Sequence, residues 1–260
     1  MQKKENKVPR KNTDWENVSE WYMKYLQEDT DSYHAKVIIP NLLRLLGDIQ
    51  NKKITDLGCG DGSIGHILRD RGARIIGVDG SQNLITHARK NAHDSETYLV
   101  QDVRKGLPKE CLKSDIFLSV LAVQNMDAIH KVFESVSKNL NPGGSFHIVT
   151  LHPSFRIPQL TDWYFDPKTK QQGRVIFSYM SESKILISQN PSKKNSEKSI
   201  TFHRPLQVYS KNLQNNGFAI RRIEEWCSHK ESDFGPRKHA EDKARKEIPM
   251  FLYIEAVRVQ

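Results

Sequence analysis

The sequence predicts an α/β fold built on a doubly wound, mostly parallel sheet. Three observations lead to this prediction. Between residues 53 and 151, apolar runs of strand length alternate with amphipathic helical segments. A glycine-rich run from Asp56 to Gly62 lies between the first strand and the first helix, and Asp79 ends the second strand. Repeated strand–helix–strand units with right-handed crossovers give parallel strands, whose carboxyl ends form a ligand-binding edge.

The elements follow in order along the chain. Helices are expected at 62–71, which Gly72 ends, at 81–91, which Ser81 caps, and at 127–140, which carries one apolar stripe. A further helix is expected at 206–215, before Asn216 and Gly217. Strands are expected near residues 53–57, 73–79, 96–101, 114–121, 144–151, 218–226 and 250–259.

Two regions stand apart from this alternation at the N-terminus. Residues 1–12 have the composition of a disordered basic arm. Residues 13–50 are expected to form a helical cap on a single domain that spans 13–260. The evidence is a second helix at Pro40–Leu46 and, before it, apolar side chains at helical spacing, namely Trp15, Val18, Trp21, Tyr22, Tyr25 and Leu26.

Residues 152–205 interrupt the pattern in the second half of the chain. They hold three consecutive aromatic residues, 163–165, and two β-rich pieces, Val175–Ile187 and Ser199–His203. The segment is too long for a simple connection. We therefore expect an inserted β-hairpin lid over the sheet.

Charge and composition limit the possible partners. The net charge is +9, of which residues 1–12 carry +4 and residues 152–205 carry +5. These segments either meet an anionic partner or are simply solvated. Without a basic face interleaved with aromatic residues, a small-molecule partner is favoured over nucleic acid. The pattern predicts no particular oligomeric state.

Localisation follows from the apolar runs and the cysteines. The longest apolar stretches are too short to span a bilayer, and no apolar segment follows the charged N-terminus. Three cysteines show neither metal-ligand spacing nor a paired framework, so no metal is expected. The predicted location is a reducing cytoplasm.

The strand ends predict a site for an adenosine-containing cofactor. Glycines at 58, 60 and 62 let the backbone approach a ligand, and the next helix turns its N-terminal N–H groups toward it. Asp79 can accept bonds from two ribose hydroxyls, or simply initiate a helix. Asp102, at the end of the third strand, can accept from an adenine amine, or be a turn residue.

Four motifs resemble those of class I S-adenosylmethionine-dependent methyltransferases. They are Ile54–Gly62 (ITDLGCGDG), Gly77–Ser81 (GVDGS), Gln101–Val103 (QDV) and Leu140–Gly144 (LNPGG). The resemblance implies seven strands with the last antiparallel, and S-adenosylmethionine as cofactor. It also implies that Asp56, Gly58, Cys59 and Gly60 hold the methionine half, Asp79 and Gly80 the ribose, Asp102 and Val103 the adenine, with Leu121 beside the sulfonium.

Two further segments, 152–156 (HPSFR) and 202–206 (FHRPL), resemble a subgroup close to quinone-type and other small-molecule methyltransferases. Tyr22 and Tyr33 also fit that subgroup, in which such residues help to close the pocket. The resemblance therefore implies that both tyrosines contact the substrate.

The chemistry needs little beyond alignment, because the methyl group of a sulfonium is already activated. Positioning can contribute about 7–11 kcal/mol, whereas a general base adds about 10²–10⁴-fold. His152 and His203 are the candidate bases, with a structural role as the alternative. Arg156 and Arg204 could clamp a carboxylate or phosphate, or pair with acids of the lid. Trp163 could form an apolar substrate wall, or pack the insertion.

We therefore expect methyl transfer from S-adenosylmethionine to a small organic acceptor, anionic or aromatic, by in-line displacement. Three alternatives remain. The glycine spacing alone would suit a nicotinamide-dependent oxidoreductase. An intact cofactor site also suits a non-catalytic S-adenosylmethionine-binding module. The basic arm would suit an RNA or protein methyltransferase, although residues 123–126 lack the signature of base-amino methylation.

Overall fold

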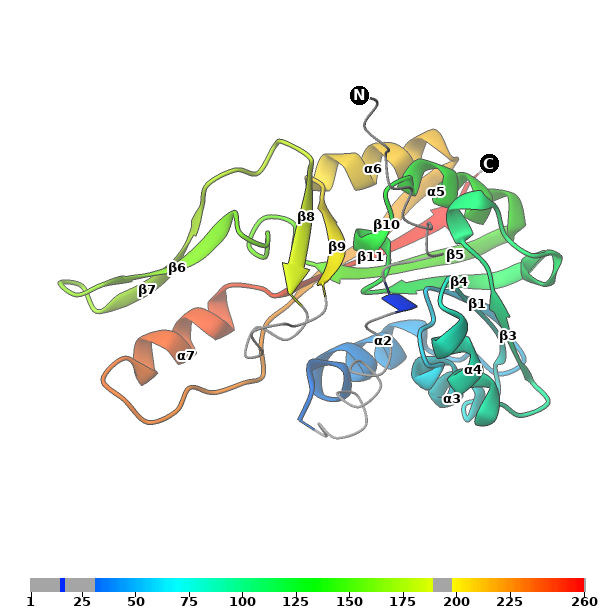
Figure 1. Cartoon of the computed structure of the whole chain (residues 1–260), viewed down its shortest axis with the longest axis horizontal. Helices are drawn as coiled ribbons and strands as arrows, with labels where there is room; N and C mark the ends of the chain where they lie inside the picture. The colour runs from blue at the N-terminus through cyan, green and yellow to red at the C-terminus, as the bar shows by residue number, and fades with distance from the viewer. Residues whose placement is uncertain (1–14, 17–30, 189–197, 260) are drawn as a thin grey trace, which may run out of the picture.

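The structure is a computed structural model that describes residues 15–16, 31–188 and 198–259. A seven-stranded sheet in the order β10-β11-β5-β4-β1-β2-β3 forms its centre (Figure 1). All neighbours pair in parallel except β11, which runs antiparallel to β5 and β10. The predicted fold is thus confirmed, with strands β1 Lys53–Leu57, β2 Arg74–Asp79, β3 Glu96–Val100, β4 Ser114–Val120, β5 Leu140–Leu151, β10 Phe218–Trp226 and β11 Phe251–Arg258.

The strand order reverses between β1 and β4. The chain adds β2 and β3 on one side of β1, and then returns to place β4 on the other side. At such a reversal the loops after two adjacent parallel strands leave toward opposite faces, and a crevice opens between them. The loops that follow Leu57 and Val120 therefore flank the predicted ligand-binding edge.

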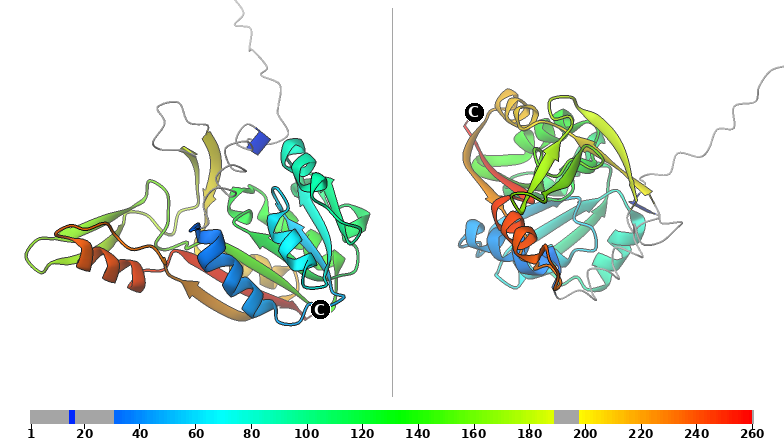
Figure 2. Two further views of the ribbon diagram at one scale, coloured as in Figure 1. Left: turned by 90° about the horizontal axis from the view of Figure 1, so that it is seen from below. Right: turned by 90° about the vertical axis from the view of Figure 1, so that its left-hand side faces the viewer.

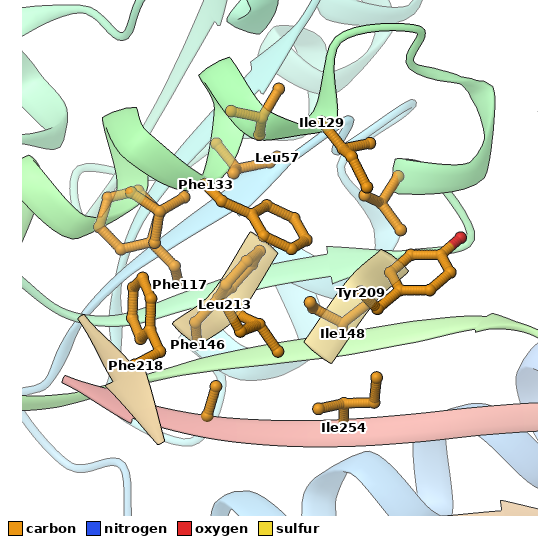
Figure 3. Close-up of a cluster of buried hydrophobic side chains, with 14 of the residues drawn as sticks. Leu57, Phe117, Ile129, Phe133, Phe146, Ile148, Tyr209, Leu213, Phe218 and Ile254 are labelled. Atoms are coloured by element: carbon orange, nitrogen blue, oxygen red, sulfur yellow. The ribbon is translucent and has the colours of Figure 1, made fainter. Parts of the chain in front are cut away.

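Helices cover both faces of the sheet. One face packs against α5 (Ile129–Asn139) and α6 (Leu206–Asn215), where Phe133 and Phe146 meet edge to face with ring centroids 5.3 Å apart (Figure 3). The other face packs against the π-helical turn η1 (His34–Ile38), α2 (Ile39–Leu46) and α3 (Ser63–Arg69). Alternating strand residues feed the two cores: Phe117 faces α5, and its neighbour Leu118 faces the α2 side. The remaining helix beside the site is α4, Gln82–Lys90.

The insertion differs from the expected single hairpin because it contains two. β6 (Thr161–Asp166) pairs with β7 (Gln171–Ile176), and β8 (Ser183–Ser188) pairs with β9 (Lys198–His203) (Figures 1 and 2). The expected strand piece at 175–187 is therefore wrong as one unit. Polar residues at 178, 181 and 182 break it, so its start belongs to β7 and its end to β8.

A helix between the last two strands was not expected. α7 (Lys238–Glu247) buries only two small side chains, Ala240 and Ala244, so it shows no stripe of large apolar residues. The helix lies beside the β6–β7 hairpin, and just before it Arg237 stacks over Phe165 at 4.5 Å (Figure 1).

Some predictions fall outside the described residues. These are the basic arm and most of the expected first helix, including Tyr22. Among the described helices, none has the length and apolar character needed to cross a membrane.

Candidate active site

A cleft of about 290 Å³ opens at the carboxyl ends of β1 to β4, beneath the β8–β9 hairpin. Trp15 also lines it. The cleft brings together seven of the nine residues predicted to bind the cofactor: Gly58, Gly60, Asp79, Gly80, Asp102, Val103 and Leu121. The two others, Asp56 and Cys59, lie beneath the glycine loop.

Gly58 is required by a close approach between two loops. Its φ is +73°, and a Cβ atom placed there would lie 2.4 Å from the Cβ of Ala122 in the loop after β4. Its amide donates to the carbonyl oxygen of Val78 at 2.7 Å. Only glycine allows the loops after β1 and β4 to touch at the point where the strand order reverses.

Asp79 fixes the glycine loop and also faces the cleft. Its Oδ2 accepts from the amide of Gly60 at 3.1 Å, and its Oδ1 accepts from the amide of Ser81 at 2.8 Å. Burial raises the pKa of this carboxyl group, while the two amide bonds oppose the rise. The carboxylate is thus held rigidly at the end of β2, with a side open to the cleft.

Asp56 and Cys59 are buried below the loop. Asp56 is only 2% exposed, and burial, followed by the charge of Asp79, raises its pKa to about 7. Cys59 packs with Ile85, Ala88 and Tyr98, and burial raises the pKa of its thiol. The Cys59 side chain therefore supports the loop from inside, and Asp56 lies buried near the end of β1.

A buried tyrosine that the sequence reasoning missed supports the same loop. A Cβ atom at Gly62 would lie 2.9 Å from the Tyr98 ring, and one at Gly65 would lie 2.5 Å from its hydroxyl. The Tyr98 hydroxyl donates to Glu96 at 2.8 Å, and Glu96 in turn pairs with Arg69 at 2.8 Å. Part of the Gly-x-Gly-x-x-Gly spacing therefore serves helix–sheet packing. The sequence could have indicated this role, because residues 96 and 98 are two apart in a strand and therefore share one face of β3.

Asp102 is engaged by a neighbouring arginine. It accepts from Arg104 Nε at 2.7 Å and Nη2 at 2.9 Å, and Arg104 Nη1 reaches Asp127 at 3.1 Å. Burial would raise the pKa of Asp102, but the bonds and charge of Arg104 hold it below its usual value. An ion-pair bridge therefore joins the loops after β3 and β4 at the cleft.

The loop after β4 carries backbone strain. Leu121 has φ of +51°, which is unusual for a residue with a branched side chain. Its amide donates to the carbonyl oxygen of Val149 at 2.8 Å, and its carbonyl oxygen accepts from the side-chain amide of Asn125 at 3.2 Å. The short helix η4 (Val123–Asn125) follows. This geometry turns Leu121, Ala122 and Met126 toward the cleft.

The β8–β9 hairpin contributes a surface that sequence reasoning did not identify. In its register Lys184 pairs with Phe202, and Leu186 pairs with Ile200, so these four side chains share one face. Three of them line the cleft. We call this face the roof: Lys184, Leu186, Ile200 and Phe202. The alternation of polar and apolar residues within 198–203 is the sequence pattern that could have identified this face.

The predicted lid residues His203 and Arg204 do not line the cleft. His203 Nε2 donates to the carbonyl oxygen of Tyr179 at 2.6 Å. Arg204 is 4% exposed, and its Nη2 donates to the carbonyl oxygens of Met126 at 2.5 Å and Asp127 at 2.9 Å. Arg204 therefore ties the lid to the loop after β4.

His152 also lies away from the cleft. Its Nε2 is 2.6 Å from Glu225 Oε1, and its Nδ1 accepts from the amide of Ser154 at 3.2 Å. Its ring lies 4.7 Å from that of Phe155. Burial lowers the pKa of this imidazole even though Glu225 opposes the shift. The contacts hold the start of the insertion against β10.

The three remaining described candidates also lie outside the cleft. The ring of Trp163 contacts two guanidinium groups, which lie 5.0 Å (Arg156) and 4.9 Å (Arg174) from its centroid. The hydroxyl oxygen of Tyr33 lies 3.0 Å from Oγ of Ser228, and the Tyr33 ring packs edge to face on the ring of Phe251. The contacts of Trp163 lie within the insertion, and those of Tyr33 join the N-terminal segment to the C-terminal part of the fold.

Comparisons with known proteins agree with this architecture. A family model described as a methyltransferase domain matches residues 55–148. The crystal structure of an S-adenosylmethionine-dependent methyltransferase from Mesorhizobium loti is 28% identical, covers 84% of this chain and 96% of that chain, and superposes with a TM-score of 0.68. An uncharacterized protein of Haemophilus influenzae is 26% identical over 95% of this chain and 96% of its own length.

A malonyl-[acyl-carrier protein] O-methyltransferase of Pseudescherichia vulneris is 30% identical over 119 residues. That alignment covers 46% of each chain, so this chain spans about half the length of that relative. Together, the matched methyltransferase domain, the fold and the solved structures indicate an S-adenosylmethionine-dependent methyltransferase.

Proposed function

We propose that the protein transfers a methyl group from S-adenosylmethionine to the oxygen of a small organic acceptor with an apolar or aromatic body and an anionic group. One observation carries the proposal: the roof faces the same cleft as the glycine loop and Asp79. The similarity to a malonyl-[acyl-carrier protein] O-methyltransferase supports oxygen as the methyl acceptor.

The residues of the cleft suit the cofactor. Asp79 offers a rigid carboxylate for the ribose hydroxyls, and Gly58 and Gly60 line the cleft, where the lack of a Cβ atom leaves room for the methionine half. Val103 offers an apolar contact for adenine, beside Asp102. The bound cofactor supplies a methyl group on a positively charged sulfur whose leaving group is a neutral thioether. The chain must therefore mainly orient the acceptor and exclude water.

The roof suits the acceptor. Ile200 and Phe202 offer apolar contact, and Lys184 offers a positive charge on the same face. Across the cleft, Ala122 and Met126 complete an apolar slot. Such a slot fits an aromatic or aliphatic body whose anionic group reaches Lys184.

A general base is not needed for such an acceptor. Among the described residues that line the cleft, none is a histidine. An oxygen acceptor that is already ionised carries no proton to remove, so alignment alone can account for the rate. We therefore propose that His152 and His203 stabilise the lid and that neither takes a proton in the reaction.

Incubating the purified protein with S-adenosylmethionine and a metabolite mixture tests this proposal. Mass spectrometry should find an acidic product that is heavier by one CH₂ group. The Asp79→Ala protein is the matched control, and it should form much less of that product. Absence of any methylated small molecule, with label appearing on RNA or protein instead, would contradict the proposal. The cytoplasmic location remains a proposal, supported by three free cysteines.

A further inference from the structure

A second, smaller cavity of about 20 Å³ lies beside β9 and shares Phe202 with the cleft. Ile200 points to the cleft, while Thr201 and His203 alternate to the opposite face and line the small cavity. The cavity is where the two lid motifs meet, because Arg156 comes from the first and Arg204 from the second. The proposed methyl transfer leaves both arginines without a direct role.

Both guanidinium groups have donors that no described residue satisfies. In Arg204, Nη2 is bonded to two carbonyl oxygens and Nε lies 3.6 Å from Glu182, but Nη1 has no partner among the described residues. In Arg156, Nε and Nη2 are buried and equally lack a partner within the described part of the chain. A buried donor without an acceptor is costly, and more so when it carries charge.

The lining of the cavity carries positive charge. Of the described residues that line it, none is acidic. Burial, followed by the charge of Arg174, lowers the pKa of Arg156. Thr201 and Tyr209 also line the cavity, and the Thr201 hydroxyl lies 3.4 Å from the carbonyl oxygen of Gln124. The volume suits one small anionic group rather than a whole metabolite.

We infer that this cavity binds a carboxylate group, held between the free donors of Arg156 and Arg204. Arginine donors match the planar geometry of a carboxylate. We expect the group to come from a free small carboxylic acid, because the anionic group of the proposed acceptor reaches Lys184, which lines the cleft and not this cavity. The bound anion would tie the base of the lid to the loop after β4, because Arg204 already holds that loop.

Formate is the probe, since it is the smallest carboxylate. The full-length protein is titrated with sodium formate in thermal unfolding and calorimetric experiments. Ionic strength is kept constant with gluconate, which is too large for the cavity. A saturable stabilisation by formate is expected, and Arg156→Met should weaken formate affinity by at least about tenfold. Lys168→Met, which removes an exposed lid charge, should leave the affinity unchanged.

If Arg156→Met does not fold, Arg156→Lys provides the second test and should weaken formate binding by about threefold or more, because an ammonium group lacks the paired donors of a guanidinium. Formate that binds independently of the methyl acceptor would support a free acid as the occupant, whereas competition between the two would contradict it. No saturable effect, or the same effect in Arg156→Met, would overturn the inference. Formate binding is measured without methyl transfer, so it stands or falls separately from the proposed reaction.

Discussion

The floor and the lid of the cleft offer a direct comparison. The floor, which we define as Gly58, Gly60, Asp79 and Asp102, consists of residues at the carboxyl ends of β1 to β3. The lid, residues 152–205, closes the cleft with alternate residues of one hairpin. In the floor, the residues singled out by sequence motifs lie in the cleft. In the lid, the histidines and arginines of the motifs lie outside the cleft, while Phe202 of the second motif and nearby Ile200 face it.

The two regions differ in what decides which of their residues face the cleft. A parallel sheet delivers its strand ends to one edge, so position in the chain is enough to locate a floor residue. A two-stranded hairpin has two faces, and a shift of one residue exchanges them. The charged residues of the lid motifs are used to anchor it, while less distinctive residues such as Ile200 meet the cleft.

The largest effect is expected for Gly58→Ala, which forces apart the loops after β1 and β4. The added Cβ would lie 2.4 Å from Ala122 at a positive φ, so the loop must move. We expect a loss of about 100-fold in affinity for S-adenosylhomocysteine by calorimetry, because displaced groups lose their alignment. Gly173→Ala is the control, since nothing lies within 4 Å of its added Cβ. Equal losses in both variants would contradict the contact.

The second effect concerns the buried carboxyl group under the floor. The pKa of Asp56 is raised to about 7 in the folded protein, whereas the pKa of an aspartate in an unfolded chain is about 3.9. Between these two pH values the folded protein therefore binds one proton more than the unfolded chain. The contribution of Asp56 to stability is therefore present at low pH and is lost as pH rises toward 7. Asp56→Asn should remove this loss and stabilise the unliganded protein at pH 8 by on the order of 2 kcal/mol.

Chemical denaturation of both proteins at pH 5 and pH 8 measures this effect. The stability difference between the variant and the wild type should grow with pH. A difference that stays constant would show that the Asp56 carboxyl group is already ionised at pH 5.

Asp79→Ala tests the floor at the ribose position. Loss of charge-assisted bonds costs about 1.5–3 kcal/mol each, so cofactor affinity should fall at least about tenfold. The variant also frees the amides of Gly60 and Ser81, which Asp79 now holds. Asp79→Asn keeps an acceptor for one of these amides and should fall between the wild type and Asp79→Ala. Unchanged calorimetric affinity in Asp79→Ala would refute the ribose assignment.

Two isoleucines of the lid test its two faces with the same substitution. Ile200→Ala removes contact area from the roof and should raise the acceptor KM about fivefold, with cofactor affinity retained. Ile185 lies on the buried, opposite face of the hairpin. Ile185→Ala should therefore lower the free energy of unfolding by about 2–4 kcal/mol while leaving the acceptor KM nearly unchanged. The reverse pattern in steady-state kinetics would mean that the acceptor binds behind β9.

The smallest effect on turnover is expected for His152→Gln. The imidazole is bonded to Glu225 and lies outside the cleft, so kcat should change by less than about twofold. The melting temperature should fall, because a buried polar contact is weakened. A loss of about 100-fold or more in kcat, with an unchanged melting temperature, would restore His152 as a general base.

Sequence patterns predicted most of the fold because its main strands alternate with helices of clear apolar periodicity. They missed α7, whose buried face consists of Ala240 and Ala244, and they merged the ends of β7 and β8. In the site, motif spacing located the floor. It did not reveal Tyr98 beneath the glycine loop or Lys184 on the roof, because those roles depend on packing and on hairpin register.

The most direct test of the account is a crystal structure of the protein with S-adenosylhomocysteine. We expect the ribose hydroxyls to lie within hydrogen-bond distance of Asp79 and adenine to pack on Val103. The sulfur should lie beside Leu121 and beneath the roof. A nucleoside bound elsewhere, or a cleft filled by protein side chains with no room for it, would contradict the assignment of this cleft.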